Sequence, residues 1–151
     1  MARRTFIAAW MALALLSCSA PDQRPAEIIV SNGWTREIAP GQSIAAVYLT
    51  IANKGEGSDR LVDVESAHGD ATLHQSSSSG GIARMRPLED GLEIAPGSTV
   101  ELKPGGTHIM VIGLKQHPIS ALTLGFERSG KRPVAIRVVA AGGDAHSGHG
   151  M

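Results

Sequence analysis

The chain has 151 residues, with 14 basic and 14 acidic side chains and therefore no formal net charge at neutral pH. This length corresponds to one domain with a sizeable apolar core, and the balanced charge, without a basic stripe, argues against a nucleic-acid partner. The single cysteine, Cys18, leaves no pair for an intramolecular disulfide, so stability must come from buried apolar side chains.

The N-terminus has the layout of a cleaved export signal. Arg3 and Arg4 precede an apolar run over residues 6–16 that is too short to span a membrane as a helix. The junction Leu15-Leu16-Ser17-Cys18 resembles a bacterial lipobox, in which the cysteine is lipidated and becomes the mature N-terminus. We therefore expect a signal over residues 1–17 and a lipid anchor at Cys18. This places the protein in the periplasm, or otherwise outside the cytoplasmic membrane of a bacterium.

Two features of the export signal stay open. Cleavage after Ala20 would instead leave Pro21 at the new N-terminus, a poor substrate for ordinary signal cleavage. The run Arg3-Arg4-Thr5-Phe6-Ile7 resembles a twin-arginine motif, and an ordinary basic n-region is an equally good interpretation. Removal of residues 1–17 takes away two of the 14 basic residues and none of the 14 acidic ones, which leaves a net charge of −2.

The body of the chain has the pattern of a β protein. A polar tether over residues 18–26 leads into short apolar runs between turn signals such as Pro40-Gly41 and Pro96-Gly97, and apolar and polar residues alternate with a period of two. Strands are predicted near residues 27–33, 44–53, 60–66, 71–75, 82–86, 98–103, 107–113, 120–127 and 133–139. The pattern predicts one all-β domain over residues 27–140, an antiparallel β-sandwich.

Two segments are predicted to lack regular structure. The stretch from Gln75 to Gly81, with four serines and two glycines, should be a mobile loop because it has little to bury. The tail over residues 141–151 carries His146, His149 and Met151. This tail is either an inert flexible end or an auxiliary site that takes copper as Cu(II).

One short predicted strand carries the most informative pair, His108 and Met110, in Thr107-His108-Ile109-Met110. Residues i and i+2 of a strand point to the same face, so an imidazole and a thioether should lie side by side. These soft, uncharged donors suit copper, above all Cu(I), better than zinc, calcium or magnesium. The plainer interpretation is a core methionine beside a surface histidine.

A second pair, His74 and Met85, flanks the serine-rich stretch and should be close in space. The sequence does not place this pair beside the first. If the sandwich brings both pairs together at one end, the result is a site of two histidines and two methionines without a charged ligand, which favours Cu(I). His68 and His117 are expected to be structural or exposed histidines, with His68 an alternative auxiliary donor.

The spacing of the four donors resembles the His-x10-Met-x21-His-x-Met signature of the periplasmic copper chaperones called PCuAC, with one extra residue in the second gap. The resemblance extends to Gly33-Trp34-Thr35-Arg36, residues 46–53 and Pro104-Gly105-Gly106. It implies a cupredoxin-like Greek-key sandwich that binds Cu(I) through His74, Met85, His108 and Met110. It also implies delivery of copper to the CuA centre of cytochrome oxidase or to another copper chaperone, by a protein that is not an enzyme and that we expect to be a monomer.

Other functions fit the sequence less well. A blue-copper electron carrier needs a cysteine thiolate, which the domain lacks, and a histidine-brace oxidase needs histidine at the mature N-terminus. A hydrolase would use the serines at 76–79 beside His74, but no orienting acid or oxyanion site is identifiable. The alternative from another class is a lipid-anchored adhesion or scaffold module without a metal.

Overall fold

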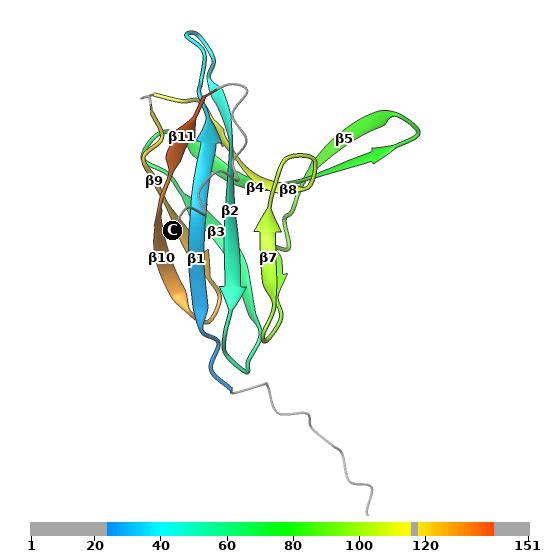
Figure 1. Ribbon diagram of the computed structural model, residues 1–151, viewed down its shortest axis with the longest axis vertical. Coiled ribbons are helices and arrows are strands. Elements are labelled where there is room, and N and C mark those ends of the chain that lie inside the picture. The colour runs from blue at the N-terminus through cyan, green and yellow to red at the C-terminus, as the bar shows by residue number, and fades with distance from the viewer. Residues whose placement is uncertain (1–23, 116–117, 141–151) are drawn as a thin grey trace, which may run out of the picture.

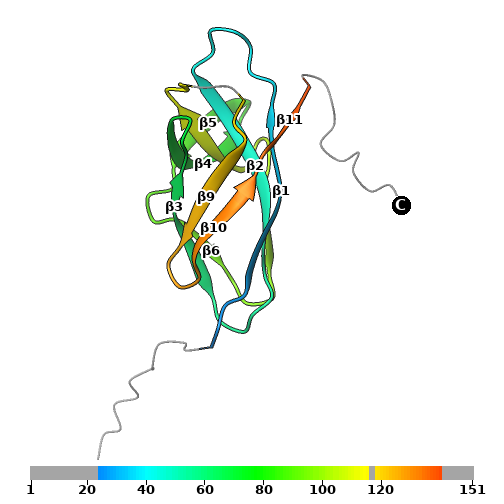
Figure 2. The same cartoon turned by 90° about the vertical axis from the view of Figure 1, so that its left-hand side faces the viewer.

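The protein is represented by a computed structural model that describes residues 24–115 and 118–140. Within these residues every regular element is a strand, and the strands form two sheets that face each other (Figures 1 and 2). The described part therefore holds no helix able to cross a membrane. The predicted signal, Cys18, His117 and the tail with His146, His149 and Met151 lie outside the described residues.

The larger sheet has seven strands. Six follow one another in the order β11 (Arg137–Val139), β1 (Ile28–Arg36), β2 (Ile44–Asn53), β8 (Thr107–Ile112), β4 (Asp70–Ser79) and β5 (Ile82–Pro87). The seventh, β7 (Thr99–Leu102), pairs with the far end of β2, beyond the segment that pairs with β8. All of these pairings are antiparallel except that of β1 with β11, which is parallel.

The smaller sheet packs against the inner face of the larger one. Its four antiparallel strands run in the order β10 (Gly130–Ala135), β9 (Ala121–Phe126), β3 (Asp59–Glu65) and β6 (Leu92–Ile94). Alternate residues of the central strands fill the space between the sheets, among them Val47, Leu49 and Ile51 of β2 and Leu122 and Leu124 of β9. The predicted antiparallel β-sandwich is confirmed, and the period-two alternation reflects this single shared core.

A bulge in β1 changes which face its side chains occupy. The register with β2 shifts by one residue between Ser31 and Trp34, and Asn32 has a positive φ of 54°. A Cβ atom on Gly33 would come within 2.5 Å of the Ala135 carbonyl oxygen, so only glycine fits this close approach. The extra residue turns Trp34 to the outer face of the larger sheet, opposite Tyr48.

The C-terminal strand is divided between the two sheets, whereas the sequence predicted one strand over 133–139. β10 pairs with β9 in the smaller sheet, and after Ile136 the chain continues as β11 alongside β1 in the larger sheet. Strand β6 was also missed, because three residues between the turns at Gly91 and Gly97 are too few for a visible alternation.

The prediction of a mobile loop over Gln75 to Gly81 is wrong. Ser76 to Ser79 continue β4 and pair residue by residue with β5, from Ser76 opposite Met85 to Ser79 opposite Ile82. Gly80 and Gly81 form a two-residue turn with φ values of 58° and 78°, the left-handed conformation that tight hairpin turns require. The hairpin projects from the body of the sandwich (Figure 1). The sequence signal that could have revealed this hairpin is the pair Gly80-Gly81 between two segments short enough to be its strands.

Candidate metal centre

Strands β4 and β8 bring the two histidines together. His74 and His108 are direct partners across the antiparallel ladder, so their side chains leave the sheet on the same face. Their ring centroids are 6.2 Å apart, with the planes inclined by 24°. Residues at 74 and 108, far apart in the sequence, therefore meet by strand pairing alone.

Met110 lies on the same face as these histidines. It is two residues after His108 in β8 and stands opposite Thr72 of β4 on one side and Ala46 of β2 on the other. Ile109 and Val111, the alternate residues, point into the core and are fully buried. The prediction that the imidazole and the thioether share a face is confirmed by this register, and the structure shows that this face is the one opposite to the core.

Met85 joins the face from the third strand. It pairs with Ser76, which is two residues after His74, so Met85 is a diagonal neighbour of His74 on the same side of the sheet. Its side chain is 54% exposed. The four predicted donors thus lie on the outer face of the larger sheet, over β8, β4 and β5. His74 lies where β4 leaves its pairing with β8 and continues into the projecting hairpin.

Hydrogen bonds orient both imidazole rings. His108 Nδ1 lies 3.0 Å from the carbonyl oxygen of Gly106, which can only accept, so Nδ1 carries the proton and donates it. His74 Nδ1 lies 3.3 Å from Thr72 Oγ1 and 3.4 Å from the Thr72 carbonyl oxygen, which fits the same tautomer. In this tautomer the Nε2 lone pair of each ring is free to bind a metal.

Two aromatic side chains extend the row of rings across the outer face. Tyr48 lies 6.3 Å from His108 and 4.5 Å from Trp34, measured between ring centroids. His108 is only 4% exposed although it points away from the core, because its neighbours on this face cover it. Burial raises the pKa of Tyr48, an effect that the nearby charge of Arg36 partly offsets. The sequence pattern alone does not predict Tyr48 and Trp34 as neighbours of the donors, because their place depends on non-local strand pairing.

The outer face that carries the four donors is here called the donor face, and in the described part of the chain no Asp or Glu joins its two histidines as a third ligand. In residues 24–115 and 118–140, no three side chains of histidine, cysteine, aspartate or glutamate are grouped as a metal site would require. The available set is two imidazoles and two thioethers. Thioethers are poor ligands for hard divalent ions and good ones for Cu(I), so this set is chemically suited to a soft, monovalent cation.

His68 is separated from this set. It precedes β4, and its carbonyl oxygen accepts a hydrogen bond from the Lys115 backbone N–H, at the end of the β4 and β8 ladder where Asp70 pairs with Ile112. Its Nδ1 is buried and has no hydrogen-bond partner in the described part of the chain. The position supports a structural histidine and makes it a poor candidate for an auxiliary donor.

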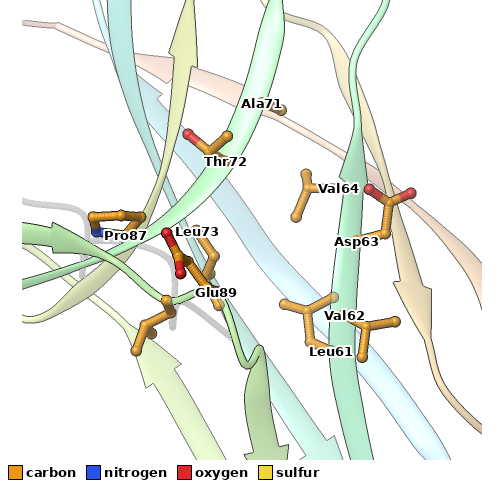
Figure 3. Close-up of a pocket in the computed structure, with 10 residues that line it drawn as sticks. Leu61, Val62, Asp63, Val64, Ala71, Thr72, Leu73, Pro87 and Glu89 are labelled. Atoms are coloured by element: carbon orange, nitrogen blue, oxygen red, sulfur yellow. The ribbon is translucent and has the colours of Figure 1, made fainter.

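The structure also has a pocket of about 230 Å³ at the edge of the sandwich, between β3 and the strands β4 and β5 (Figure 3). Leu61, Val64 and Leu73 give it an apolar floor, and Asp63 and Glu89 stand at its wall. None of the four donors lines it, so it is distinct from the donor face.

Comparison with known proteins identifies the family. Residues 28–138 match the LpqE-like family, described as "Putative lipoprotein LpqE-like". The chain belongs to the LpqE-like family. A curated relative, "Putative lipoprotein Lxx21020" of Leifsonia xyli subsp. xyli, is 33% identical over 128 residues, which cover 81% of this chain and 75% of the relative.

Solved structures similar to this LpqE-like chain include PCuAC domains. The copper-bound PCuAC domain from PmoF2 is 24% identical, with a TM-score of 0.62 over 76% of this chain and 93% of that domain. The apo PCuAC domain from PmoF1 is 25% identical, also with a TM-score of 0.62, over 76% and 94%. The Cu(I) form of DR1885 from Deinococcus radiodurans is 24% identical, with a TM-score of 0.58 over 78% and 80%.

These similarities confirm the cupredoxin-like Greek-key fold class. They also refine the resemblance drawn from the sequence: the matching family is LpqE-like, and PCuAC domains are its structural neighbours.

Proposed function

We propose that this LpqE-like protein is an exported copper chaperone that binds one Cu(I) ion through His74, Met85, His108 and Met110. The observation that carries the proposal is the direct pairing of His74 with His108 on a sheet face that also holds both methionines. The similarity to a copper-bound PCuAC domain and to the Cu(I) form of DR1885 supports it.

The donor chemistry explains how such a site could both hold and release its cargo. Neutral donors match the low charge of Cu(I), and two imidazoles with free Nε2 atoms supply the firmer bonds. The thioether of Met85 is exposed on the outer strand, so it can leave first and open a position for an incoming thiolate. Release by stepwise ligand exchange follows from this difference in exposure.

We further propose that Cys18 anchors the protein by lipidation outside the cytoplasmic membrane. The descriptions of the family and of its curated relative, which both contain the word lipoprotein, support this assignment. The acceptor would then be the CuA centre of cytochrome oxidase or another copper chaperone, reached across the space outside that membrane. The protein itself carries copper without changing a substrate.

The proposal is tested by measuring Cu(I) affinity under anaerobic conditions, in competition with a coloured Cu(I) chelator. The wild-type protein should bind one Cu(I) that the chelator removes only in excess. Met110→Leu keeps the volume of the side chain, and His108→Ala removes an imidazole, so each should weaken binding at least about tenfold, or 1.4 kcal/mol.

The matched control is His68→Gln, which removes a histidine that lies away from the donor face. It should leave Cu(I) affinity unchanged. Unchanged affinity in both donor variants would reject the site, and the absence of stoichiometric uptake by the wild-type protein would favour a scaffold module.

A further inference from the structure

The hairpin formed by the outer parts of β4 and β5, residues 76–86, is here called the arm. It projects from the sandwich (Figure 1), and every residue of β5 is exposed, including Ile82 at 61%. β5 is the last strand of its sheet, so its outer edge pairs with no other strand of the described chain. At its base, the Ser76 backbone N–H donates to the Gly106 carbonyl oxygen at 3.1 Å, which ties the arm to the loop before His108.

The two faces of the arm differ in charge. Alternation along β5 places Met85 and Ala83 on the donor face, together with Ser76 and Ser78 of β4. Arg84 and Arg86 occupy the opposite face. One side of the arm is therefore uncharged and carries a predicted copper ligand, and the other is cationic.

Two arginines supply the charge of this second face. Arg84 and Arg86 are the only Lys, Arg, Asp or Glu residues between Asp70 and Glu89. Within the described residues neither arginine forms an ion pair. The Arg86 guanidinium donates a hydrogen bond of 3.1 Å to Gln75 Oε1. This contact orients the guanidinium, and because the amide is neutral it does not cancel the positive charge.

We propose that the arginine face of the arm is a docking surface for an acidic patch on the protein that receives the copper. This inference rests on the proposed function and adds the chemistry of the partner. Guanidinium groups bind carboxylates through paired hydrogen bonds, and opposite charges on two proteins accelerate their association. Arg84 and Arg86 flank Met85 on the edge strand, so a partner that binds both guanidinium groups can bring its thiolates to the exposed thioether around the free edge of β5.

Two other occupants fit the arm less well. If a second copy paired antiparallel along the free edge with Met85 opposite Met85, Arg84 would face Arg86 of the other copy, and like charges at paired positions are unfavourable.

An anionic membrane is disfavoured as the occupant by the position of the tether over residues 18–26. The described chain begins at the end of the sandwich away from the arm (Figures 1 and 2), and the six peptide links from Cys18 to Arg24 span at most about 22 Å.

The test compares copper transfer to two synthetic peptides that share one Cys-x-x-Cys dithiol and differ only in flanking glutamates or lysines. Cu(I)-loaded wild-type protein should transfer copper about tenfold faster to the acidic peptide at low ionic strength, and the preference should fade as salt is added. The double substitution R84E/R86E should reverse the preference while one Cu(I) is still bound with unchanged affinity. The control K54E/K131E makes the same change of charge away from the arm and should keep the wild-type preference.

The outcomes separate the two proposals. Binding of Cu(I) with equal transfer to both peptides, or a preference for the acidic peptide that survives R84E/R86E, would overturn the docking surface alone. Failure of the wild-type protein to bind Cu(I) would overturn the proposed function and the docking surface with it. Arginine-dependent binding to phosphatidylglycerol vesicles, without any preference between the peptides, would assign the arm to a membrane and reject the acidic protein partner.

Discussion

His74 and His108 stand directly opposite each other on adjacent antiparallel strands, with ring centroids 6.2 Å apart. Each ring has its Nδ1 atom against a backbone carbonyl oxygen, so the Nε2 atoms remain available. The strands thus hold the two imidazoles in place before any metal binds, so metal binding costs little side-chain entropy at these two ligands.

Tyr48 should protect the copper site on the side toward β2. Its ring lies between Trp34 and His108, so Tyr48→Ala removes an aromatic contact worth about 0.5–1.5 kcal/mol and opens the buried imidazole to solvent. We expect the Cu(I) form of this variant to oxidise faster in air than the wild type, followed by optical and paramagnetic resonance spectra. Tyr48→Phe keeps the ring and should behave as wild type. Equal oxidation rates in Tyr48→Ala and wild type would contradict a protective role.

The Gly80-Gly81 turn should control the position of Met85. Both residues have positive φ, where a side chain costs about 1–2 kcal/mol per residue, so Gly80→Val should loosen the hairpin. Because the arm projects from the core, the midpoint of global unfolding should hardly move, whereas amide exchange of β5 should accelerate and Cu(I) affinity should fall. Ser79→Ala, which leaves the turn intact, is the control. Unchanged exchange in β5 would show that the turn does not hold the hairpin.

Asp59 should make stability fall in acid. Its buried carboxylate accepts backbone N–H bonds from Arg60, Arg128 and Ser129 at 2.8 to 3.0 Å. Burial alone would raise the pKa of Asp59, but the interaction with the Ser129 side chain and the backbone hydrogen bonds together outweigh burial and lower the pKa below its ordinary value. The stabilisation is therefore fully present above the ordinary aspartate pKa of about 3.9 and is lost as the pH falls through the lower folded-state pKa.

Urea unfolding at neutral and acidic pH tests this account. Asp59→Asn should cost about 1–3 kcal/mol at neutral pH, because one backbone N–H then faces an amide group that cannot accept its bond. The variant should also lose less stability than the wild type between neutral pH and pH 3 or below. Asp63→Asn, on an exposed position of the same strand, should change neither quantity. Parallel pH profiles of wild type and Asp59→Asn would be inconsistent with a lowered pKa.

The tail with His146, His149 and Met151 should bind copper separately from the donor face. Truncation after Ala141 should remove one weak Cu(II)-binding event in calorimetry and leave the affinity for Cu(I) as it was. The same loss should follow from replacing both tail histidines with glutamine in the full chain. If Cu(II) uptake survives the truncation, the tail is not a copper site.

The sequence predicted most of the strands because alternation with a period of two follows directly from burial of one face. It also predicted that His108 and Met110 share a face, since this depends only on local strand geometry. The hairpin was missed because its serines have little apolar surface, and strand pairing of polar residues leaves no hydrophobic pattern.

The meeting of the donor pairs depends on non-local register and could not be derived from alternation. That His74 lies opposite His108 is fixed by how β4 aligns with β8 across more than thirty intervening residues. The position of Trp34 depends on the bulge at Asn32 and Gly33, which inverts the alternation of β1. A family signature supplied the grouping of donors that local physics alone left open.

X-ray absorption at the copper edge of the Cu(I)-loaded protein tests the central claim most directly. The account predicts a first coordination shell of nitrogen and sulfur, with two imidazoles resolved by their outer-shell scattering and two sulfurs. Met110→Leu and Met85→Leu should each lose one sulfur. A shell without sulfur, or a spectrum that neither substitution alters, would contradict copper binding on this sheet face.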